Sequence, residues 1–324
     1  MKDGRKPIWQ RAAALLAGVL LTSTFTAMAT TATAAGQKPE TLRIGYQKYG
    51  ILVILKSQGD LEKRLGQLGV KVEWTEFPFG PPLLEAMNVG SIDVGTVGES
   101  PPVFAQAARA DLVYIGAEPE AVHAEAIVVP KTSAITRIAD LKGKKVVVAK
   151  GSNAHYLLVK SLEKGGLKYT DIDPVYLAPA DARAAFDGGK VDAWAIWDPF
   201  LAGVVQQTGA RVVTDGAGIV DNHQFYLASR SYAEKYPQII KILNEEIART
   251  DQWVQSNPKA VAQSLSALLG IDAGILEVSV RRLGVGVRPV TADILAKQQK
   301  IGDAFYQLKL IPHAIKPSEW AWNK

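Results

Sequence analysis

The chain has 324 residues and no cysteine, with 48% hydrophobic residues, 21% charged residues and a formal net charge of +5. This composition is typical of a globular protein with enough chain for two hydrophobic cores, and it argues against disorder. Basic residues alternate with acidic ones, as where Asp140 precedes Lys142 and Lys144, so no basic stripe is available and no nucleic-acid partner is expected.

The first segment has the pattern of a secretory signal peptide. Lys2, Arg5, Lys6 and Arg11 precede an uncharged stretch with an apolar core, and Ala32-Thr33-Ala34 offers a cleavage site of the small-x-small type. We expect residues 1–34 to be removed and the product to be periplasmic. A retained membrane anchor is the alternative, but the apolar core is about half as long as a bilayer span. No cysteine follows this core, so a lipid anchor has no acceptor.

From residue 41 onward, strand-like and helix-like segments alternate with short polar, glycine or proline joints, which predicts an α/β fold. The first series is strand 42–46, helix 51–68, strand 70–74, helix 82–89, strand 92–97, helix 103–109 and strand 112–115. An extended crossing at 125–130 leads to a second series, which runs from a strand ending at 148 through helix 154–164, strand 175–177, helix 180–187, strand 191–197, helix 199–207 and strand 211–213. A return crossing at 221–229 precedes helices 232–257, 258–269, 272–282 and 291–308.

Two βα series joined by two crossings predict a two-lobed fold in which the crossings form a hinge and the ligand cleft lies between the lobes. We expect residues 35–126 to form the first part of lobe 1 and residues 127–218 to form lobe 2. Residues 219–324 then supply the return crossing, the rest of lobe 1 and the C-terminal helices. Ligands of such folds bind beyond the carboxyl ends of the strands.

A short phrase occurs once in each series, where a strand ends in glycine and a serine then opens a helix. The first copy is Gly98-Glu99-Ser100 and the second is Gly151-Ser152-Asn153. Glycine allows close approach of the backbone, serine is a preferred N-cap, and the free amide groups of a helix start favour an anion. Two such starts facing each other would hold one oxyanion.

At these residues the chain resembles the periplasmic substrate-binding component of aliphatic sulfonate ABC transporters. The matching stretches are 42–50, 74–78, 88–93, 98–107, 140–145, 150–158, 179–186, 191–199, 218–227 and 284–288. The resemblance implies a type II periplasmic-binding-protein fold that captures aliphatic sulfonates and delivers them, for sulfur supply, to a membrane permease with its cytoplasmic ATPase. It implies a monomer without cofactor, metal or catalytic residues. Ser100 stands where the family often has threonine, and the stretch around Arg288 looks rearranged.

The candidate ligand-binding residues follow from the clamp and the resemblance. Gln47 ends the first strand and offers an amide donor, and Gly98 and Ser100 offer backbone and hydroxyl donors, as Ser152 and Asn153 do from the other lobe. For Gln47 the alternative is a loop residue facing water.

Four more residues are candidates for the site: Glu99, His155, Trp197 and Asp198. Glu99 would repel a sulfonate, so it either turns toward a contact between lobes or meets a cationic group of the ligand. His155 is a candidate contact, although a lone histidine is more often structural. Trp197 offers an apolar wall and an indole donor where Trp197-Asp198 leaves the sheet, while Trp194 is expected in the core.

Three further residues are not included in the candidate site. Arg183 could reach the cleft, but Asp181 and Asp187 are available to pair with it at the surface. His223 lies on the return crossing and is a candidate hinge residue. No ligand contact is assigned to Arg288.

A hydrolase on the same scaffold is the second hypothesis, but the chain has no G-x-S-x-G, no cysteine nucleophile and no H-E-x-x-H, and its four histidines are scattered. The same fold with another cargo, such as taurine, nitrate, a sulfate ester or a thiamine-related pyrimidine, is the third.

Overall fold

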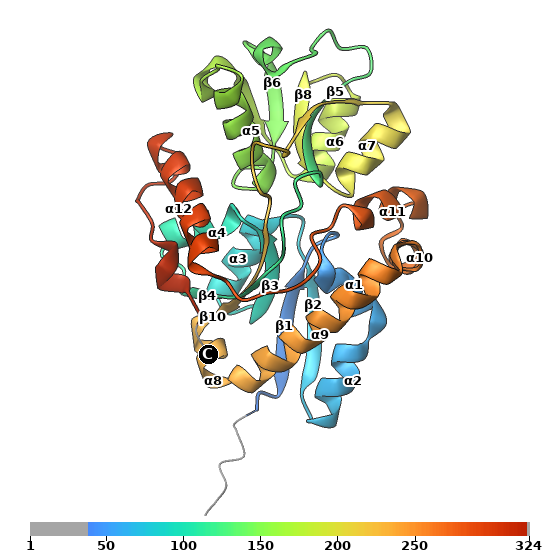
Figure 1. Ribbon diagram of the computed structural model, residues 1–324, viewed down its shortest axis with the longest axis vertical. Coiled ribbons are helices and arrows are strands. Elements are labelled where there is room, and N and C mark those ends of the chain that lie inside the picture. Colours follow the sequence, from blue (N-terminus) through green and yellow to red (C-terminus); the bar gives the residue numbers. More distant parts are fainter. Residues whose placement is uncertain (1–37, 323–324) are drawn as a thin grey trace, which may run out of the picture. The chain divides into compact units, whose positions relative to one another are not determined.

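The computed structural model describes residues 38–322, and within them the strands form two separate five-stranded sheets (Figure 1). The first sheet has the order β2-β1-β3-β10-β4, with β2 Lys71–Glu76, β1 Thr41–Tyr46, β3 Val94–Gly98, β10 Gln224–Ser229 and β4 Leu112–Ala117. The second has the order β7-β6-β8-β5-β9, with β7 Asp173–Tyr176, β6 Lys145–Val148, β8 Ala193–Trp197, β5 Glu125–Val129 and β9 Arg211–Asp215. The two-lobed α/β fold is confirmed. The predicted signal peptide, 1–34, lies outside the described residues.

The stretches predicted as extended crossings are strands, and this part of the prediction is wrong. Residues 125–129 form β5, antiparallel to β8 and β9, and residues 224–229 form β10, antiparallel to β3 and β4. The connections between sheets are therefore the shorter segments 118–124 and 216–223, here called the first and second crossings. Both strands are largely apolar and buried on both faces, as is typical of central strands in covered sheets. The other strand pairs are parallel.

Helices cover both faces of the first sheet, which buries the alternate side chains of its strands. In β10, Phe225 and Leu227 face one core while Tyr226 and Ala228 face the other. One face packs against α3 Gly80–Asn88, and the other packs against α1 Ile51–Gln58, α2 Asp60–Gln67, α8 Arg230–Lys235, α9 Pro237–Ser256, α10 Pro258–Leu269 and α11 Ala273–Arg281.

Two helices predicted as continuous are broken. The predicted helix 51–68 is interrupted at Gly59, whose φ of 70° is left-handed and ends α1 before α2 begins. The predicted helix 232–257 is interrupted at Tyr236, because Pro237 cannot continue the preceding helix but can open α9 at its first position.

The second sheet is sandwiched in the same way. On one face lies α5 Asn153–Lys164, and on the other lie α6 Pro179–Asp187 and α7 Phe200–Thr208. Trp194 is 1% exposed and packs against Phe186, with ring centroids 5.8 Å apart, so its predicted place in the core is confirmed.

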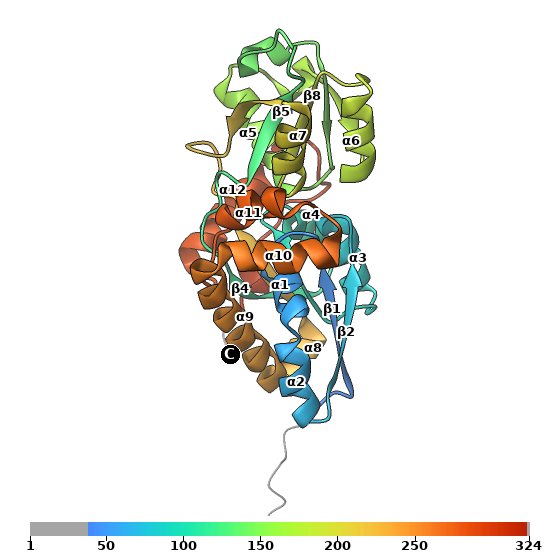
Figure 2. The same ribbon diagram turned by 90° about the vertical axis from the view of Figure 1, so that its right-hand side faces the viewer.

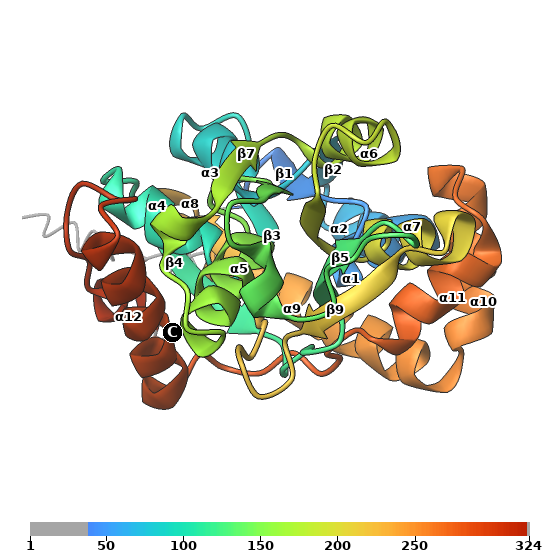
Figure 3. The ribbon, with the colours of Figure 1, turned by 90° about the horizontal axis from the view of Figure 1, so that it is seen from above.

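One late helix contacts both lobes. Helix α12 Ala292–Gln307 packs against α4 Pro101–Ala107 of lobe 1, and its Phe305 lies 4.8 Å from Phe104 and 5.9 Å from Tyr156 of α5 between ring centroids. Figures 1 and 3 show α12 on the side of the molecule away from α10 and α11, and Figure 2 looks onto α10 and α11. Among the described residues, no helix is both long and apolar enough to cross a membrane.

Candidate functional site

A small cavity of about 30 Å³ lies between the lobes, beyond the carboxyl ends of β1, β3 and β8; we call it the head cavity. Its lining comes from lobe 1 (Gln47, Tyr49, Gly80, Gly98 and Pro101), from lobe 2 (Ser152, Asn153 and Trp197) and from the second crossing and the start of β10 (Asn222 and Gln224). None of these side chains carries a charge. A space of this size holds about two water molecules, so it suits a compact polar group.

The second glycine-serine phrase forms the helix start that the sequence predicts. Ser152 is the N-cap of α5, and its hydroxyl accepts the backbone N–H of His155 at 3.3 Å. The helix is 12 residues long, so its N-terminus brings partial positive charge to the edge of the head cavity. The cavity therefore has one wall that favours an anion.

Asn153 holds the two lobes and the second crossing together. Its Oδ1 accepts the backbone N–H of Ser100 at 3.1 Å, and its Nδ2 donates to Asn222 Oδ1 at 2.5 Å. The contact is so close that a Cβ atom added to Gly98 would lie 2.1–2.3 Å from the Asn153 amide. Gly98 thus provides the space in which Asn153 crosses between the lobes.

The first glycine-serine phrase differs from the prediction, because Ser100 does not cap α4 with its side chain. Its backbone is helical (φ −84°, ψ −41°) and its buried hydroxyl has no hydrogen-bond partner. Pro101 and Pro102 have no N–H, and the next amide, of Val103, donates to the Ser100 carbonyl at 3.0 Å. This helix start has no free amide for an anion, so the expected double clamp has only one helix start.

Glu99 lies outside the head cavity and faces the second crossing. Its carboxylate accepts the backbone N–H of His223 at 2.9 Å, and its own carbonyl accepts from Gln298 Nε2 at 2.9 Å. Burial raises the pKa of Glu99 to about 7. The Glu99 carboxylate is therefore committed to a contact with the second crossing.

His155 also lies outside the head cavity, as does Asp198, which is described below. The ring of His155 is fully buried; its Nδ1 accepts the Gly151 N–H at 3.1 Å, so Nε2 carries the proton toward the Tyr169 hydroxyl, 2.8 Å away. Burial lowers the pKa of His155 to about 3, which keeps the ring neutral. Both of its ring nitrogens are thereby committed to protein contacts.

Asp198 supports the chain where it leaves β8. Its carboxylate accepts the Ala202 N–H at 2.9 Å and pairs with Arg282 at 3.3 Å. Burial raises the pKa of Asp198 to about 6, against the opposing effect of Arg282. This pair joins the end of α11 to lobe 2.

Of the nine residues proposed from the sequence, five line the head cavity: Gln47, Gly98, Ser152, Asn153 and Trp197. The amide of Gln47 also donates to the Thr96 carbonyl at 3.1 Å, which fixes its orientation. Arg183 pairs with Asp187 at 2.6 Å, the surface pairing that its neighbours suggested.

Sequence reasoning missed five lining residues: Tyr49, Gly80, Pro101, Asn222 and Gln224. Tyr49 is 7% exposed, and its hydroxyl has no hydrogen-bond partner within the protein, which leaves it free for a ligand. In the sequence, the position of Tyr49 two residues after the candidate Gln47 indicates that it could belong to the site. Asn222, which has a φ of 55°, and Gln224 flank His223 on the stretch predicted as the return crossing.

A second, larger cavity of about 190 Å³ adjoins the first and shares Gln47, Tyr49 and Trp197 with it; we call it the tail cavity. Most of its other lining is apolar: Phe77, Pro78, Ala178, Pro179, Ala180, Pro199 and Phe200, together with Lys48 and Glu76. Lys48 and Glu76 pair with each other at 3.8 Å, so this cavity also presents no uncompensated charge.

Two lobes that enclose a neutral polar cavity beyond their strand ends define a solute-binding protein. Residues 61–265 match the family model described as the substrate binding domain of an ABC-type glycine betaine transport system. The crystal structure of the periplasmic aliphatic sulphonate binding protein SsuA from Escherichia coli is similar, with 45% identity and a TM-score of 0.80, covering 88% of this chain and 93% of that one.

The alkanesulfonate-binding protein SsuA from Xanthomonas axonopodis pv. citri, bound to MOPS, gives 40% identity and a TM-score of 0.84 over 89% of this chain and 100% of that one. An Escherichia coli (strain K12) protein named for aliphatic sulfonates binding is 46% identical over 310 residues, 95% of either chain. The chain belongs to the family of aliphatic sulfonate-binding proteins, which are substrate-binding components of ABC transport systems.

Proposed function

We propose that this protein binds aliphatic sulfonates, with the sulfonate in the head cavity and the alkyl tail in the tail cavity. The observation that carries the proposal is the pairing of a neutral polar cavity with a larger apolar one through Gln47, Tyr49 and Trp197. A sulfonate is a permanent anion, so neutral donors and the α5 N-terminus can hold it without a countercharge. The tail gains by leaving water, by about 0.8 kcal/mol for each buried methylene.

The relatives support the same assignment. The Xanthomonas protein is bound to MOPS, a sulfonate with a bulky organic tail, and the two cavities here would suit such a division of head and tail. We infer that the protein is exported by its N-terminal segment, works in the periplasm and delivers its ligand to a membrane permease driven by a cytoplasmic ATPase. Binding and delivery, with no catalysis, are its proposed role.

Calorimetry on ligand-free, refolded protein tests the substrate. We expect alkanesulfonates to bind, with affinity rising about fourfold for each added methylene until the tail cavity is filled. Sulfate and nitrate have no tail and should bind far more weakly. If either of them bound while the sulfonates did not, the assignment would be wrong.

Two serines provide a matched pair of variants. Ser152→Ala removes a hydroxyl from the head cavity and should weaken sulfonate binding by roughly 10- to 150-fold, since a hydrogen bond to a charged group contributes about 1.5–3 kcal/mol. Ser100→Ala removes a buried hydroxyl that has no hydrogen-bond partner and should leave affinity unchanged. Equal effects of the two substitutions would remove the proposed head site. Thermal unfolding of each variant separates lost binding from lost helix capping.

A further inference from the structure

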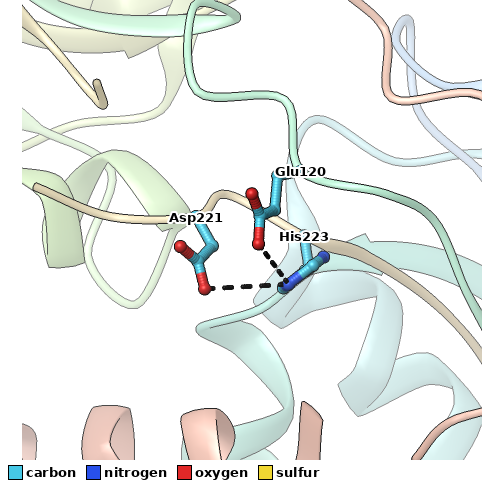
Figure 4. A group of neighbouring side chains, drawn as sticks. All are labelled: Glu120, Asp221 and His223. Carbon is cyan, nitrogen blue, oxygen red and sulfur yellow. Dashed lines mark ion pairs between the residues drawn. The ribbon is translucent and has the colours of Figure 1, made fainter. Parts of the chain in front are cut away.

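Three ligand-type side chains that do not themselves line the head cavity meet on the two crossings. Glu120 belongs to the first crossing, and Asp221 and His223 belong to the second (Figure 4). The His223 Nε2 atom lies 3.8 Å from Asp221 Oδ2 and 4.0 Å from Glu120 Oε1, and the three ligand atoms all lie within 4.8 Å of one another. The cluster thus brings together one imidazole and two carboxylates.

The tautomer of His223 leaves a lone pair directed into this cluster. Its Nδ1 lies 2.9 Å from the Glu118 carbonyl oxygen, which only accepts, so Nδ1 carries the proton. In the neutral ring, Nε2 is then the unprotonated nitrogen; it has no hydrogen-bond partner, and the side chain is 2% exposed. A histidine that donates through one nitrogen to a backbone carbonyl and leaves the other free has the arrangement typical of a metal ligand.

The charges around the cluster are unbalanced. Lys297 Nζ lies 2.8 Å from Asp221, 3.0 Å from Glu120 and 3.9 Å from Asp293. Three carboxylates therefore surround one ammonium, which leaves two negative charges. A divalent cation would balance them.

The spacing suits a small divalent cation after a modest movement. Ligand atoms around tetrahedral zinc, at bond lengths of about 2.0–2.1 Å, lie about 3.3 Å apart. On this geometry the carboxylates must approach Nε2 by about 0.5–0.7 Å and each other by up to about 1.5 Å. Glu120 and Asp221 are 48% and 37% exposed, so their side chains have room to move while the buried His223 stays in place.

We propose that a divalent transition metal with the ligand preference of Zn²⁺ binds to His223 Nε2, Glu120 and Asp221, with water completing its coordination. The metal would displace the Lys297 ammonium from between the two carboxylates. Imidazole and carboxylate donors suit zinc among the divalent metals. Because its ligands come from both crossings, the metal joins the two connections between the lobes.

Zinc titration of tag-free protein, without sulfonate ligand and in a buffer that contains no sulfonate, tests the site. We expect one saturable site per chain. Glu120→Gln and Asp221→Asn should each weaken Zn²⁺ binding at least about 10-fold, since even outer partners of a metal site contribute that much. Lys297→Met removes the competing ammonium and should tighten binding. Thermal unfolding of all three variants checks the fold, and Co²⁺ absorption reports the coordination geometry.

His123→Ala is the matched control. His123 also pairs with a carboxylate, Asp215, at 2.7 Å, but among the described residues this pair is not part of a group of three metal-ligating side chains. It should leave Zn²⁺ affinity unchanged. The proposal is overturned if no saturable site is found, if Glu120→Gln and Asp221→Asn bind Zn²⁺ as the wild type does, or if His123→Ala abolishes binding. None of these measurements depends on the sulfonate, so the proposed function is tested separately.

Discussion

Replacement of Gly98 by alanine should impair ligand binding without unfolding the protein. The added methyl group would lie 2.1–2.3 Å from the Asn153 amide, whereas non-bonded atoms pack at about 3.5–4.0 Å, so Asn153 must move by more than about 1 Å. Gly98 does not have a positive φ, so its own backbone accepts alanine without strain.

The magnitude follows from the contacts that Asn153 loses. Its amide bonds to the Ser100 N–H and to Asn222 Oδ1 each contribute about 0.5–1.5 kcal/mol. Loss of both amounts to about 1–3 kcal/mol, or roughly 5- to 150-fold in affinity if the closed arrangement is the one that binds. Calorimetric titration with an alkanesulfonate measures this loss, and thermal unfolding without ligand checks that the variant is folded.

A double substitution separates the clash from other effects of the methyl group. Asn153→Ala loses the same hydrogen bonds and also removes the obstacle, so Gly98→Ala should have little further effect in the Asn153→Ala background. Additive losses in the double variant, or wild-type affinity in Gly98→Ala alone, would refute the reasoning that Gly98 makes room for Asn153.

Three more outcomes are expected. Burial raises the pKa of Glu118 to about 8, so between its unfolded value and pH 8 the folded state keeps a proton that the unfolded state has lost, and the unfolding free energy falls as pH rises. Between pH 5 and pH 8 the unfolding free energy should fall less in Glu118→Gln than in the wild type, by at most about 4 kcal/mol. Denaturant unfolding measures it, and the same pH dependence in both proteins would contradict the prediction. Trp194→Ala should lower the free energy of unfolding by about 3–5 kcal/mol because Trp194 is buried in the core. Trp197→Ala should mainly weaken the binding of long-tailed sulfonates. If Trp197→Ala destabilised the fold and Trp194→Ala weakened binding, both assignments would be wrong. Saturating Zn²⁺ should tighten sulfonate binding a few-fold, because it would fix Asn222 between two metal ligands. Unchanged or weaker binding would show that the metal site does not favour ligand binding in the head cavity.

Local sequence patterns predicted most of the elements and the two-lobed fold, because alternation and short joints depend on neighbouring residues. The errors arose where a single residue or a buried run decided the outcome. Gly59 ends a helix that its apolar spacing would have continued. After Glu125, residues 126–129 of β5 are all apolar because the strand is covered on both faces, and such a run gives no period by which to recognise a strand.

The candidate site was less predictable, because its geometry depends on contacts between lobes. The pair Pro101-Pro102 was visible in the sequence and should have argued against a free helix start after Ser100. By contrast, the contact of Glu99 with the backbone of His223 joins residues 124 positions apart. No local pattern encodes a contact of this kind, so the direction of Glu99 could only be found in the folded protein.

The place of Trp197 between the two cavities also has an optical consequence. Its indole is partly exposed and packs at right angles to Phe200, with centroids 6.3 Å apart, whereas Trp194 is sealed in the core. An alkyl chain that replaces water beside this indole should shift its fluorescence emission to shorter wavelength, while the emission of Trp194 stays constant. Binding of an unlabelled ligand could thus be followed by tryptophan fluorescence. Loss of the emission shift in Trp197→Phe would identify Trp197 as the residue that reports binding.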